Sequence, residues 1–486
     1  MSISLDRLLI LCGIPCSGPV PDNMTVMDLT DDSRSAREGS LFVCLPGYRT
    51  DGHRYAPDAY ASGCRMFLAE RPLSLPADAI EIRVPDTASA LADLAAAFFG
   101  FPSQGLSLTG ITGTKGKTTQ AWLLHELFNR SGLKAGYIGT MGAFWPGHSV
   151  RTSNTTPDAL RLQRIFKAMR DDGVTHVALE ISSQALMTKR IRGLSFDTVV
   201  FTNLYRDHIG PGEHKSFEDY RDAKRSLFTE YAARTGIFNG DDPYSGYMRK
   251  GFLGRTVLTG RDPGSDYRIL SPEQPEPEFG ISFELERGEA RYPVRSPMSG
   301  AFNASNLAQV LAAASSAGLD LRASSEHLVG LSVPGRMEPV PFRPGIHVVI
   351  DYAHNGPSLR AALSTLRPMT KGRLIVLFGS VGERTYERRA ELAHAASELA
   401  DACVLTSDNP GQEDPYKILQ DISRELSRGF PRILIPDREE AIRTVLGELH
   451  EGDTLLLAGK GHEDYQLIGD RRIPFCERAV VESFSD

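Results

Sequence analysis

The stretch LSLTGITGTKGKTTQAWLLHELFNRSG, residues 106–132, decides the fold of the chain around it. LSLTGIT predicts a strand, a glycine-rich loop follows, and TTQAWLLHELFNRSG predicts a helix that ends at Gly132. A strand, a glycine-rich loop and a helix N-terminus together present backbone N–H groups and a positive dipole end to an anion. The stretch therefore predicts a phosphate-binding site.

Two side chains of this loop suit a nucleotide. Lys117 is expected to reach the β- and γ-phosphates, and the Thr118 hydroxyl is expected to hold Mg²⁺. The strict pattern G-x₄-G-K-[ST] is not met, because Ile111 stands where its first glycine belongs, and the shorter form G-T-x-G-K-T-T is present. The alternative is a glycine-rich turn with an incidental lysine, which the strand–loop–helix context disfavours.

Outward from the loop, strands and helices alternate. THVALEIS (175–182) and FDTVVFTN (196–203) are apolar strands with polar ends, and SGAFNASNLAQVLAAASSAG (299–318) predicts a long helix. Such alternation predicts a mostly parallel sheet covered by helices. Glycine and proline cluster at residues 100–105, and SVPGRMEPVPFRPG (332–345) reads as a linker, so we expect a central domain at 103–336.

The remaining parts of the chain predict two further α/β domains. In residues 337–486 five apolar segments each end in polar residues, which predicts a doubly wound, Rossmann-like domain with its ligand at the carboxyl ends of the strands. In residues 1–102, SLFVCLPG and CRMFLAE predict strands on either side of a short helix in YAPDAYASGC. The predicted fold class is α/β, with three domains of which the first is the smallest.

Composition excludes several classes of protein. The 486 residues carry a net charge of −7, which gives no argument for nucleic-acid binding. No apolar run approaches the roughly 18–20 residues of a membrane span, and the N-terminus lacks a signal peptide. The six cysteines are scattered without the partners of a zinc site. We expect a cytoplasmic monomer with reduced cysteines.

Polar residues at two strand ends suggest a metal site. Glu180 closes one strand, and Asp207 and His208 follow another. Each alone would more often be structural, but Mg²⁺ prefers oxygen ligands together with phosphates, and these residues follow a phosphate loop. We therefore favour a role in metal binding.

Lys224 has an unusual position in SFEDYRDAKRSLF. If Ser216 caps this helix, Lys224 shares an apolar stripe with Phe217, Tyr220 and Leu227. On sequence alone the better interpretation is a lysine with a buried stem and an ammonium in water. A buried lysine would instead have a lowered pKa, and its neutral amine could react with CO₂ to give a carbamate anion able to hold Mg²⁺.

Nine motifs in a fixed order carry a family resemblance: GTKGKTT, SNTTPDAL, EISSQAL, FTNLYRDH, AKRSLF, GAFNASN, VPGRMEPV, DYAHN and GKGHEDYQ. In these, and in DSRSAREGSLFVCLPGYRTDGH (32–53), the chain resembles the Mur ligases of the type that adds the third amino acid to UDP-MurNAc-L-Ala-D-Glu (the MurE type). The resemblance covers nearly the whole chain. It implies an ATP- and Mg²⁺-dependent ligase of peptidoglycan precursor synthesis, which activates a peptide carboxylate as an acyl phosphate for attack by an amine.

The resemblance also implies roles for individual residues. ATP contacts fall on Gly113, Thr114, Lys115, Gly116, Lys117, Thr118, Thr119, Asn303, Arg336 and Asp351. The UDP-MurNAc-dipeptide positions are Ser33, Arg34, Asn154, Thr155, Thr156, Ser182 and Arg190. The amino-acid positions are Arg384, Asp408, Asn409, Gly459 and Glu463. Lys117, Glu180, His208 and Lys224 match catalytic positions, and Thr118, Glu180, His208 and a carbamylated Lys224 match the Mg²⁺ ligands.

Three places depart from the family pattern. Gln184 stands where His is usual, RDHIGPGEHKSF replaces RDHLDYHG, and Gly411 stands where diaminopimelate-adding members have Arg in D-N-P-R. Without that bidentate partner for a second carboxylate, the sequence favours L-lysine, with ornithine or diaminopimelate as alternatives. Glu463 could accept the distal ammonium. Other readings are a related ligase, such as a folylpolyglutamate synthetase or a natural-product amide ligase, and a non-catalytic nucleotide-binding regulator.

Overall fold

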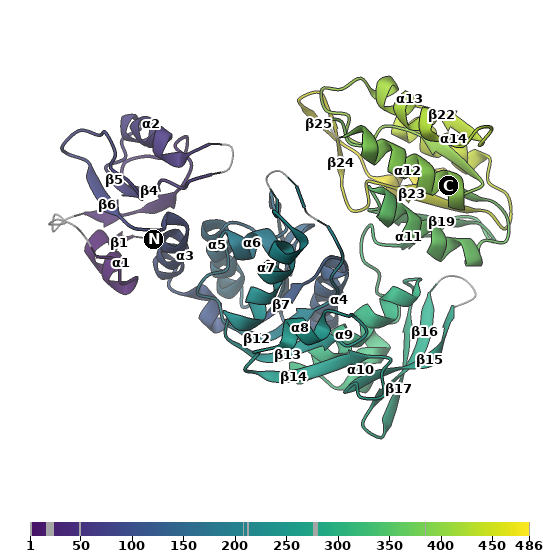
Figure 1. Cartoon of the computed structure of the whole chain (residues 1–486), viewed down its shortest axis with the longest axis horizontal. Coiled ribbons are helices and arrows are strands. Elements are labelled where there is room, and N and C mark those ends of the chain that lie inside the picture. The colour runs from purple at the N-terminus through teal and green to yellow at the C-terminus, as the bar shows by residue number, and fades with distance from the viewer. Residues whose placement is uncertain are drawn as a thin grey trace. The chain divides into compact units, whose positions relative to one another are not determined.

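The computed structural model describes residues 2–15, 24–47, 50–207, 209–210, 213–275, 280–383 and 385–485. The chain forms two compact units (Figure 1). The first contains Met1–Arg268 and Asn306–Ser324, and the second contains Ile269–Ser305 and Ser325–Asp486. Each unit is described by itself below.

A small parallel sheet opens the first unit. Its order is β3-β4-β5-β6, with β3 at Asp28–Thr30, β4 at Ser40–Val43, β5 at Met66–Ala69 and β6 at Ile80–Arg83. Helices α1 (Leu5–Leu11), α2 (Ala56–Ala61) and α3 (Thr87–Phe98) accompany it, and β1 (Ile3–Ser4) pairs with β2 (Thr25–Val26). The strands and the short helix predicted between residues 40 and 71 are confirmed.

The main sheet of the first unit is mostly parallel, as predicted. Its strands run in the order β10-β9-β8-β11-β7-β12-β13-β14, where β9 and β10 form an antiparallel hairpin at one edge. The strands are β7 (Ser107–Thr112), β8 (Ala135–Gly139), β9 (Gly142–Trp145), β10 (His148–Val150), β11 (His176–Glu180), β12 (Phe196–Phe201), β13 (Ala233–Asn239) and β14 (Arg255–Gly260).

Helices cover this sheet and complete its core. They are α4 (Lys117–Arg130), α5 (Ala159–Asp171), α6 (Ser183–Met187), α7 (Phe217–Thr229) and α8 (Ser245–Arg249). The parts of α9 (Ala301–Ser316) and α10 (Leu321–His327) that fall within residues 306–324 also belong to this unit. Large apolar side chains such as Phe166, Phe201 and Phe228 pack in one buried cluster under these elements. The helices predicted after the phosphate loop and near residue 300 correspond to α4 and α9.

The second unit contains a doubly wound sheet, as the sequence predicts. Its order is β18-β19-β23-β20-β21-β22, parallel except for β18. The strands are β18 (Glu338–Val340), β19 (His347–Asp351), β20 (Leu374–Phe378), β21 (Ala402–Leu405), β22 (Arg432–Leu434) and β23 (Thr454–Ala458). Strand β18 lies inside the stretch expected to be a linker, so that expectation is wrong there: Val340 is buried against β19.

Helices lie on both faces of this sheet and enclose two apolar clusters. They are α11 (Gly356–Leu366), α12 (Tyr386–Leu399), α13 (Pro415–Glu425), α14 (Arg438–Gly447) and α15 (Glu477–Ser485). Two antiparallel hairpins complete the unit, β16 (Ile281–Arg287) with β17 (Ala290–Ser296), and β24 (Tyr465–Ile468) with β25 (Arg471–Pro474). Strand β15 (Tyr267–Pro275) begins in the first unit, where Tyr267 pairs with Thr259 of β14.

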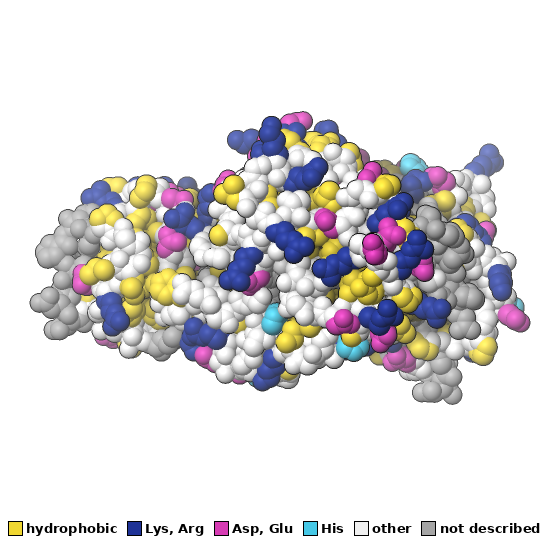
Figure 2. Space-filling view, turned by 90° about the horizontal axis from the view of Figure 1, so that it is seen from below, with side chains coloured by type: hydrophobic (Ala, Val, Ile, Leu, Met, Phe, Trp, Pro, Cys, Tyr) yellow, Lys and Arg dark blue, Asp and Glu magenta, His cyan; other side chains and the backbone are white. Residues whose placement is uncertain are grey.

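The described surface carries both signs of charge, as expected from a sequence with 54 lysine and arginine and 61 aspartate and glutamate residues. On the face shown in Figure 2, lysine and arginine side chains are interspersed with acidic ones. Within the described ranges, no helix has both the length and the apolar character needed to cross a membrane.

Candidate nucleotide and ligation site

The phosphate loop joins β7 to α4 in the form the sequence predicts. Gly113 has φ +151°, and a Cβ built there would lie 1.9 Å from Thr202 Oγ1, so only glycine fits. The loop is tied to the end of β12, because Thr114 N and Lys115 N donate to the main-chain and side-chain oxygens of Asn203 at 2.9 Å. The Lys117 ammonium donates to Gly113 O and Thr114 O at 2.9 and 3.1 Å. The loop is thus fixed at both ends, by Asn203 at the end of β12 and by Lys117 at the start of α4.

Glu180 lies beside this loop at the end of β11. Its neighbours in the sheet are β7 and β8, so the carboxyl ends of three parallel strands meet here. The side chain is fully buried and accepts hydrogen bonds from Thr118 Oγ1 at 2.9 Å, Tyr137 OH at 2.5 Å, and Thr140 N and Oγ1 at 3.0 and 3.1 Å. A carboxylate with this many donors is held in one orientation.

Lys224 is buried, so the interpretation of an ammonium in water is wrong. Ser216 caps α7 as predicted, accepting from Asp219 N, and Lys224 faces inward at 1% exposure. Its Nζ donates to Gly113 O at 3.0 Å and lies 4.5 Å from the centre of the Tyr220 ring. Burial, together with the charge of Lys117, lowers the pKa of Lys224 well below its usual range.

The donors near the loop fit a magnesium ion in part. The Thr118 hydroxyl and Glu180 Oε2 are hard oxygen ligands 2.9 Å apart, next to a phosphate loop, which is the chemistry that Mg²⁺ takes. Among the described residues there is no group of three His, Cys, Asp or Glu side chains arranged to hold a metal. His208 lies outside the described residues. As a free amine or ammonium Lys224 adds no oxygen ligand, and a carbamate would supply one.

The predicted dipeptide positions of the central sheet cluster around Glu180. Thr156 Oγ1 donates to Glu180 O at 2.9 Å and accepts from Ser182 N at 3.0 Å, and Arg190 Nη1 donates to Thr156 O at 2.9 Å. Thr155 Oγ1 lies 3.2 Å from Thr140 Oγ1, with exposed Asn154 before it. Ser33 and Arg34 instead follow β3 in the small sheet, where Arg34 pairs with Asp32.

The structure also shows supporting residues that the sequence did not single out. Tyr137 and Thr140 orient Glu180. His214, in the departing stretch, is fully buried, with Nε2 2.8 Å from Ser183 Oγ and Nδ1 3.4 Å from Asp219 Oδ2. The pairing of His214 with Ser183 ties the departing stretch to the start of α6, beside Gln184.

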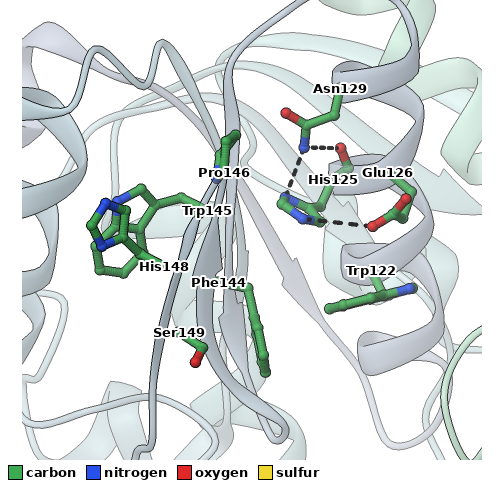
Figure 3. Close-up of a pocket in the computed structure, with 10 residues that line it drawn as sticks. Trp122, His125, Glu126, Asn129, Phe144, Trp145, Pro146, His148 and Ser149 are labelled. Carbon is green, nitrogen blue, oxygen red and sulfur yellow. Dashed lines mark hydrogen bonds and ion pairs between the residues drawn. The ribbon is translucent and has the colours of Figure 1, made fainter.

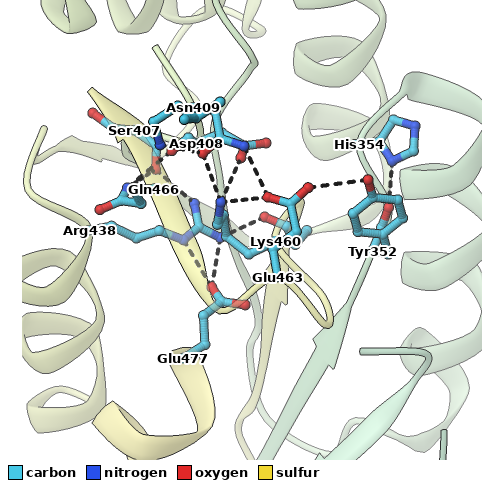
Figure 4. A network of polar contacts seen from close by, with 12 residues as sticks. Tyr352, His354, Ser407, Asp408, Asn409, Arg438, Lys460, Glu463, Gln466 and Glu477 are labelled. Atoms are coloured by element: carbon cyan, nitrogen blue, oxygen red, sulfur yellow. Dashed lines mark hydrogen bonds and ion pairs between the residues drawn. The ribbon is translucent and has the colours of Figure 1, made fainter. Parts of the chain in front are cut away.

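In the second unit, most of the predicted amino-acid positions share one buried polar network (Figure 4). Lys460 Nζ donates to Glu463 Oε2 at 2.7 Å and to Asn409 Oδ1 at 2.9 Å, and lies 3.7 Å from Asp408 Oδ1. Asn409 Nδ2 also donates to Glu463 Oε2 at 3.0 Å. Burial raises the pKa of Asp408, which the charges of Arg438 and Lys460 oppose. A Cβ built at Gly459 would lie 3.0 Å from Asp408 Oδ2.

The other predicted positions of this unit lie in well-defined surroundings. Asn303 is buried and donates to Ser299 O at 2.8 Å. Asp351 closes β19 and accepts from Met337 N at 2.7 Å, and the Arg336 guanidinium lies 4.7 Å from the centre of the Tyr352 ring. Arg384 lies outside the described residues.

A phosphate loop at the end of a parallel sheet, with a buried carboxylate and a buried lysine beside it, defines a P-loop nucleotide-binding protein. Comparison with known proteins narrows this class. Three family models match in chain order: "Mur ligase family, catalytic domain" at residues 27–99, "Mur ligase middle domain" at 111–314, and "Mur ligase, glutamate ligase domain" at 335–461.

Full-length relatives agree with these matches. A protein of Geobacillus thermodenitrificans named UDP-N-acetylmuramoyl-L-alanyl-D-glutamate--2,6-diaminopimelate ligase is 40% identical over 470 residues, 95% of each chain. One of the same name from Gloeobacter violaceus is 38% identical over 485 residues, 98% of this chain and 97% of that one. A solved structure of a ligase of that name has a TM-score of 0.72 at 30% identity, covering 100% of this chain and 99% of its own.

The chain belongs to the Mur ligase family. It is an ATP-dependent amide ligase that uses ATP and Mg²⁺, as predicted, and not a non-catalytic regulator.

Proposed function

We propose that this ligase joins a diamino acid to UDP-MurNAc-L-Ala-D-Glu in peptidoglycan precursor synthesis. The observation that carries the proposal is the similarity, over nearly the whole of both chains, to relatives named for that reaction. The relatives' names specify a UDP-N-acetylmuramoyl substrate, which supports a UDP-sugar over a folate. We further propose a cytoplasmic monomer.

The first two family matches fall within the domains expected at 1–102 and 103–336, and the third, at 335–461, begins two residues before the domain expected at 337–486. We keep this division as a proposal, with the UDP-sugar bound by the first domain, ATP by the second and the amino acid by the third. The residue roles implied by the resemblance are proposed in the same sense. The hydrogen bonds around Thr156, Ser182 and Glu180 support them, because these side chains form one connected group.

The proposed mechanism assigns distinct tasks to the chain. The loop N–H groups and Lys117 bind phosphates, and Thr118 and Glu180 would hold Mg²⁺. When bound, ATP would supply the phosphoryl group that activates the peptide carboxylate as an acyl phosphate, with ADP leaving, and Mg²⁺ would neutralise the charge that develops on the phosphates. Thr155, Thr156 and Arg190 orient that carboxylate, and Glu463 and Asp408 orient the incoming amine. Lys224, as a carbamate, completes the oxygen ligands.

We propose 2,6-diaminopimelate as the added amino acid, because the relatives compared above are named for it. The comparisons thereby favour an alternative over the lysine that the sequence favoured. L-Lysine is the second candidate, since Gly411 brings no guanidinium to a second carboxylate. The argument for lysine from the sequence relied on Glu463 to accept a distal ammonium. Lys460 Nζ already donates to Glu463 Oε2 at 2.7 Å, which weakens that argument.

Phosphate release from ATP tests the proposal. It should require UDP-MurNAc-L-Ala-D-Glu and an amino acid together, with diaminopimelate turned over faster than lysine or ornithine. Faster turnover of lysine would favour the second candidate. No release with any of the three amino acids would refute the proposed function.

A further inference from the structure

An open cavity lies on the surface of the first unit, between the outer face of α4 and the β9–β10 hairpin (Figure 3). Its volume is about 530 Å³, within the range of small-molecule sites. Trp122, His125, Glu126 and Asn129 line it from α4, at the spacing of one helix face. Phe144 and Ser149 line it from the hairpin. None of these residues has a role in the ligation reaction proposed above.

Aromatic rings form one side of the cavity. Trp122 meets Phe144 edge to face at 5.5 Å and Tyr137 at 5.4 Å. Trp145 and His148 also line the cavity from the hairpin and stack on each other at 5.1 Å, and the Trp145 Nε1 donates to Asp172. Trp122 is half-buried, so part of its indole surface is open to the cavity. Such a surface attracts organic cations.

The polar side of the cavity is negative. Glu126 is the one carboxylate among the lining residues, all of which are described, and it is half-buried. The nearby His125 is buried, which lowers its pKa to about 4, so it is neutral near pH 7. Asn129 Nδ2 faces His125 Nδ1 at 3.3 Å, which leaves Nε2 toward Glu126 Oε1 at 3.8 Å. A neutral imidazole does not compensate the carboxylate. Burial raises the pKa of Glu126, and the charge of Arg130, four residues further along α4, opposes that shift.

We propose that this cavity is a second ligand site, for a small planar organic cation that contacts Trp122 and pairs with Glu126. The indole face and the carboxylate are the two elements that recognise such a ligand. The cavity is also linked to the ligation site, because Tyr137 packs on Trp122 while its hydroxyl donates to Glu180 at 2.5 Å. Occupancy of the cavity therefore changes nucleotide affinity, and by linkage nucleotide changes the affinity of the cavity.

Tryptophan fluorescence tests the site, since Trp122 and Trp145 are the only tryptophans of the 486-residue chain. In the Trp145→Phe protein, Trp122 is the sole reporter. Benzamidinium should change its emission saturably, and benzoate, the same shape with the opposite charge, should not. Glu126→Gln should weaken benzamidinium binding at least tenfold, whereas Glu230→Gln, an exposed carboxylate at the end of α7, should not alter it.

Equal responses to benzamidinium and benzoate, or unchanged affinity in Glu126→Gln, would overturn the site. Thermal unfolding of each variant checks that it is folded. Saturating Mg²⁺–ADP should shift the benzamidinium Kd at least twofold, and an unchanged Kd would overturn the link through Tyr137. These readouts need no ligase activity, so their failure is distinct from failure of the proposed function.

Discussion

The ammonium of Lys224 lies 3.0 Å from the carbonyl oxygen of Gly113, which also accepts from Lys117 at 2.9 Å. Two ammonium groups therefore share one acceptor, and one of them is fully buried. Burial and the second charge both lower the pKa of Lys224. The amine is thus more readily neutral than an exposed lysine, which is the form that reacts with CO₂.

We predict that the activity depends on this carbamate. Removing CO₂ from the buffer should lower the rate of ligation several-fold, and bicarbonate should restore it. Lys224→Ala should lose activity by roughly 10²-fold or more, the size expected when transition-state electrostatics are lost, and bicarbonate should not restore it. The measurement is phosphate release, with ¹³C-bicarbonate labelling to detect the carbamate. Full activity of Lys224→Ala would end the carbamate hypothesis.

Removing the negative charge of Glu180 should raise the Mg²⁺ requirement. Glu180→Gln keeps the shape among Thr118, Tyr137 and Thr140, so its effect reports on charge. We expect the rate to fall roughly 10²-fold and the Mg²⁺ concentration for half-maximal rate to rise. Glu289→Gln, an exposed carboxylate in the β16–β17 turn, is the matched control. A Glu180→Gln enzyme with the Mg²⁺ dependence of the wild type would exclude a metal role.

The sequence predicts the phosphate loop well because that motif is local: Gly113, Lys117 and Thr118 are fixed by one strand, one turn and one helix. It also placed Lys224 on the apolar stripe of α7. The Nζ of Lys224 is buried because α7 packs against the phosphate loop, where Gly113 O accepts its hydrogen bond. Helix periodicity alone does not reveal this tertiary contact, so it could not predict whether the ammonium is buried or exposed.

Tertiary contacts explain the other differences. The hydrogen bonds of Tyr137 to Glu180 and of His214 to Ser183 join residues 43 and 31 positions apart, which no local pattern encodes. The proline-rich stretch after residue 332 reads as a linker, yet Val340 pairs with Val348 at the sheet edge, a position where proline neighbours are tolerated. In each of these cases the structure depends on a contact between residues far apart in the sequence.

Gly411 offers a test of amino-acid selection. It sits at φ +59°, and nothing lies within 4 Å of a Cβ built there, so a longer side chain has room at a backbone cost of about 1–2 kcal/mol. The β24–β25 hairpin holds it through Gly411 N to Leu467 O at 3.2 Å and Gly469 N to Gly411 O at 2.8 Å. Gly411→Arg should raise kcat/KM for diaminopimelate relative to lysine at least tenfold, because a guanidinium pairs bidentately with a carboxylate.

Gly411→Gln is the control for this substitution, since it carries the same backbone strain without the charge. Competition between the two amino acids in one reaction gives the ratio directly. If Gly411→Arg and Gly411→Gln give the same ratio, position 411 does not contact the distal group of the amino acid.

Removing one member of the buried pair of Arg438 and Glu477 should strongly destabilise the second unit. Arg438 donates to Glu477 Oε1 at 2.7 Å, and both side chains are almost fully buried. Arg438→Met leaves the carboxylate buried without its cation, which costs about 3–5 kcal/mol of unfolding free energy. Arg438→Met with Glu477→Leu should recover most of that loss, although Ser407 O and Ala458 O lose a donor in both proteins.

The pH dependence of the Tm distinguishes a buried unpaired carboxylate from a simple loss of packing in Arg438→Met. Burial raises the pKa of Glu477, and Arg438 opposes that shift. In Arg438→Met the opposition is gone, so the folded state holds a proton that the unfolded state releases above about pH 4.3. The folded protein is then favoured at low pH and loses stability as pH rises through the raised pKa. The Tm of Arg438→Met should therefore fall further below that of the wild type as the pH rises from 5 to 8. If the difference in Tm does not change with pH and persists in the double variant, the loss comes from packing instead.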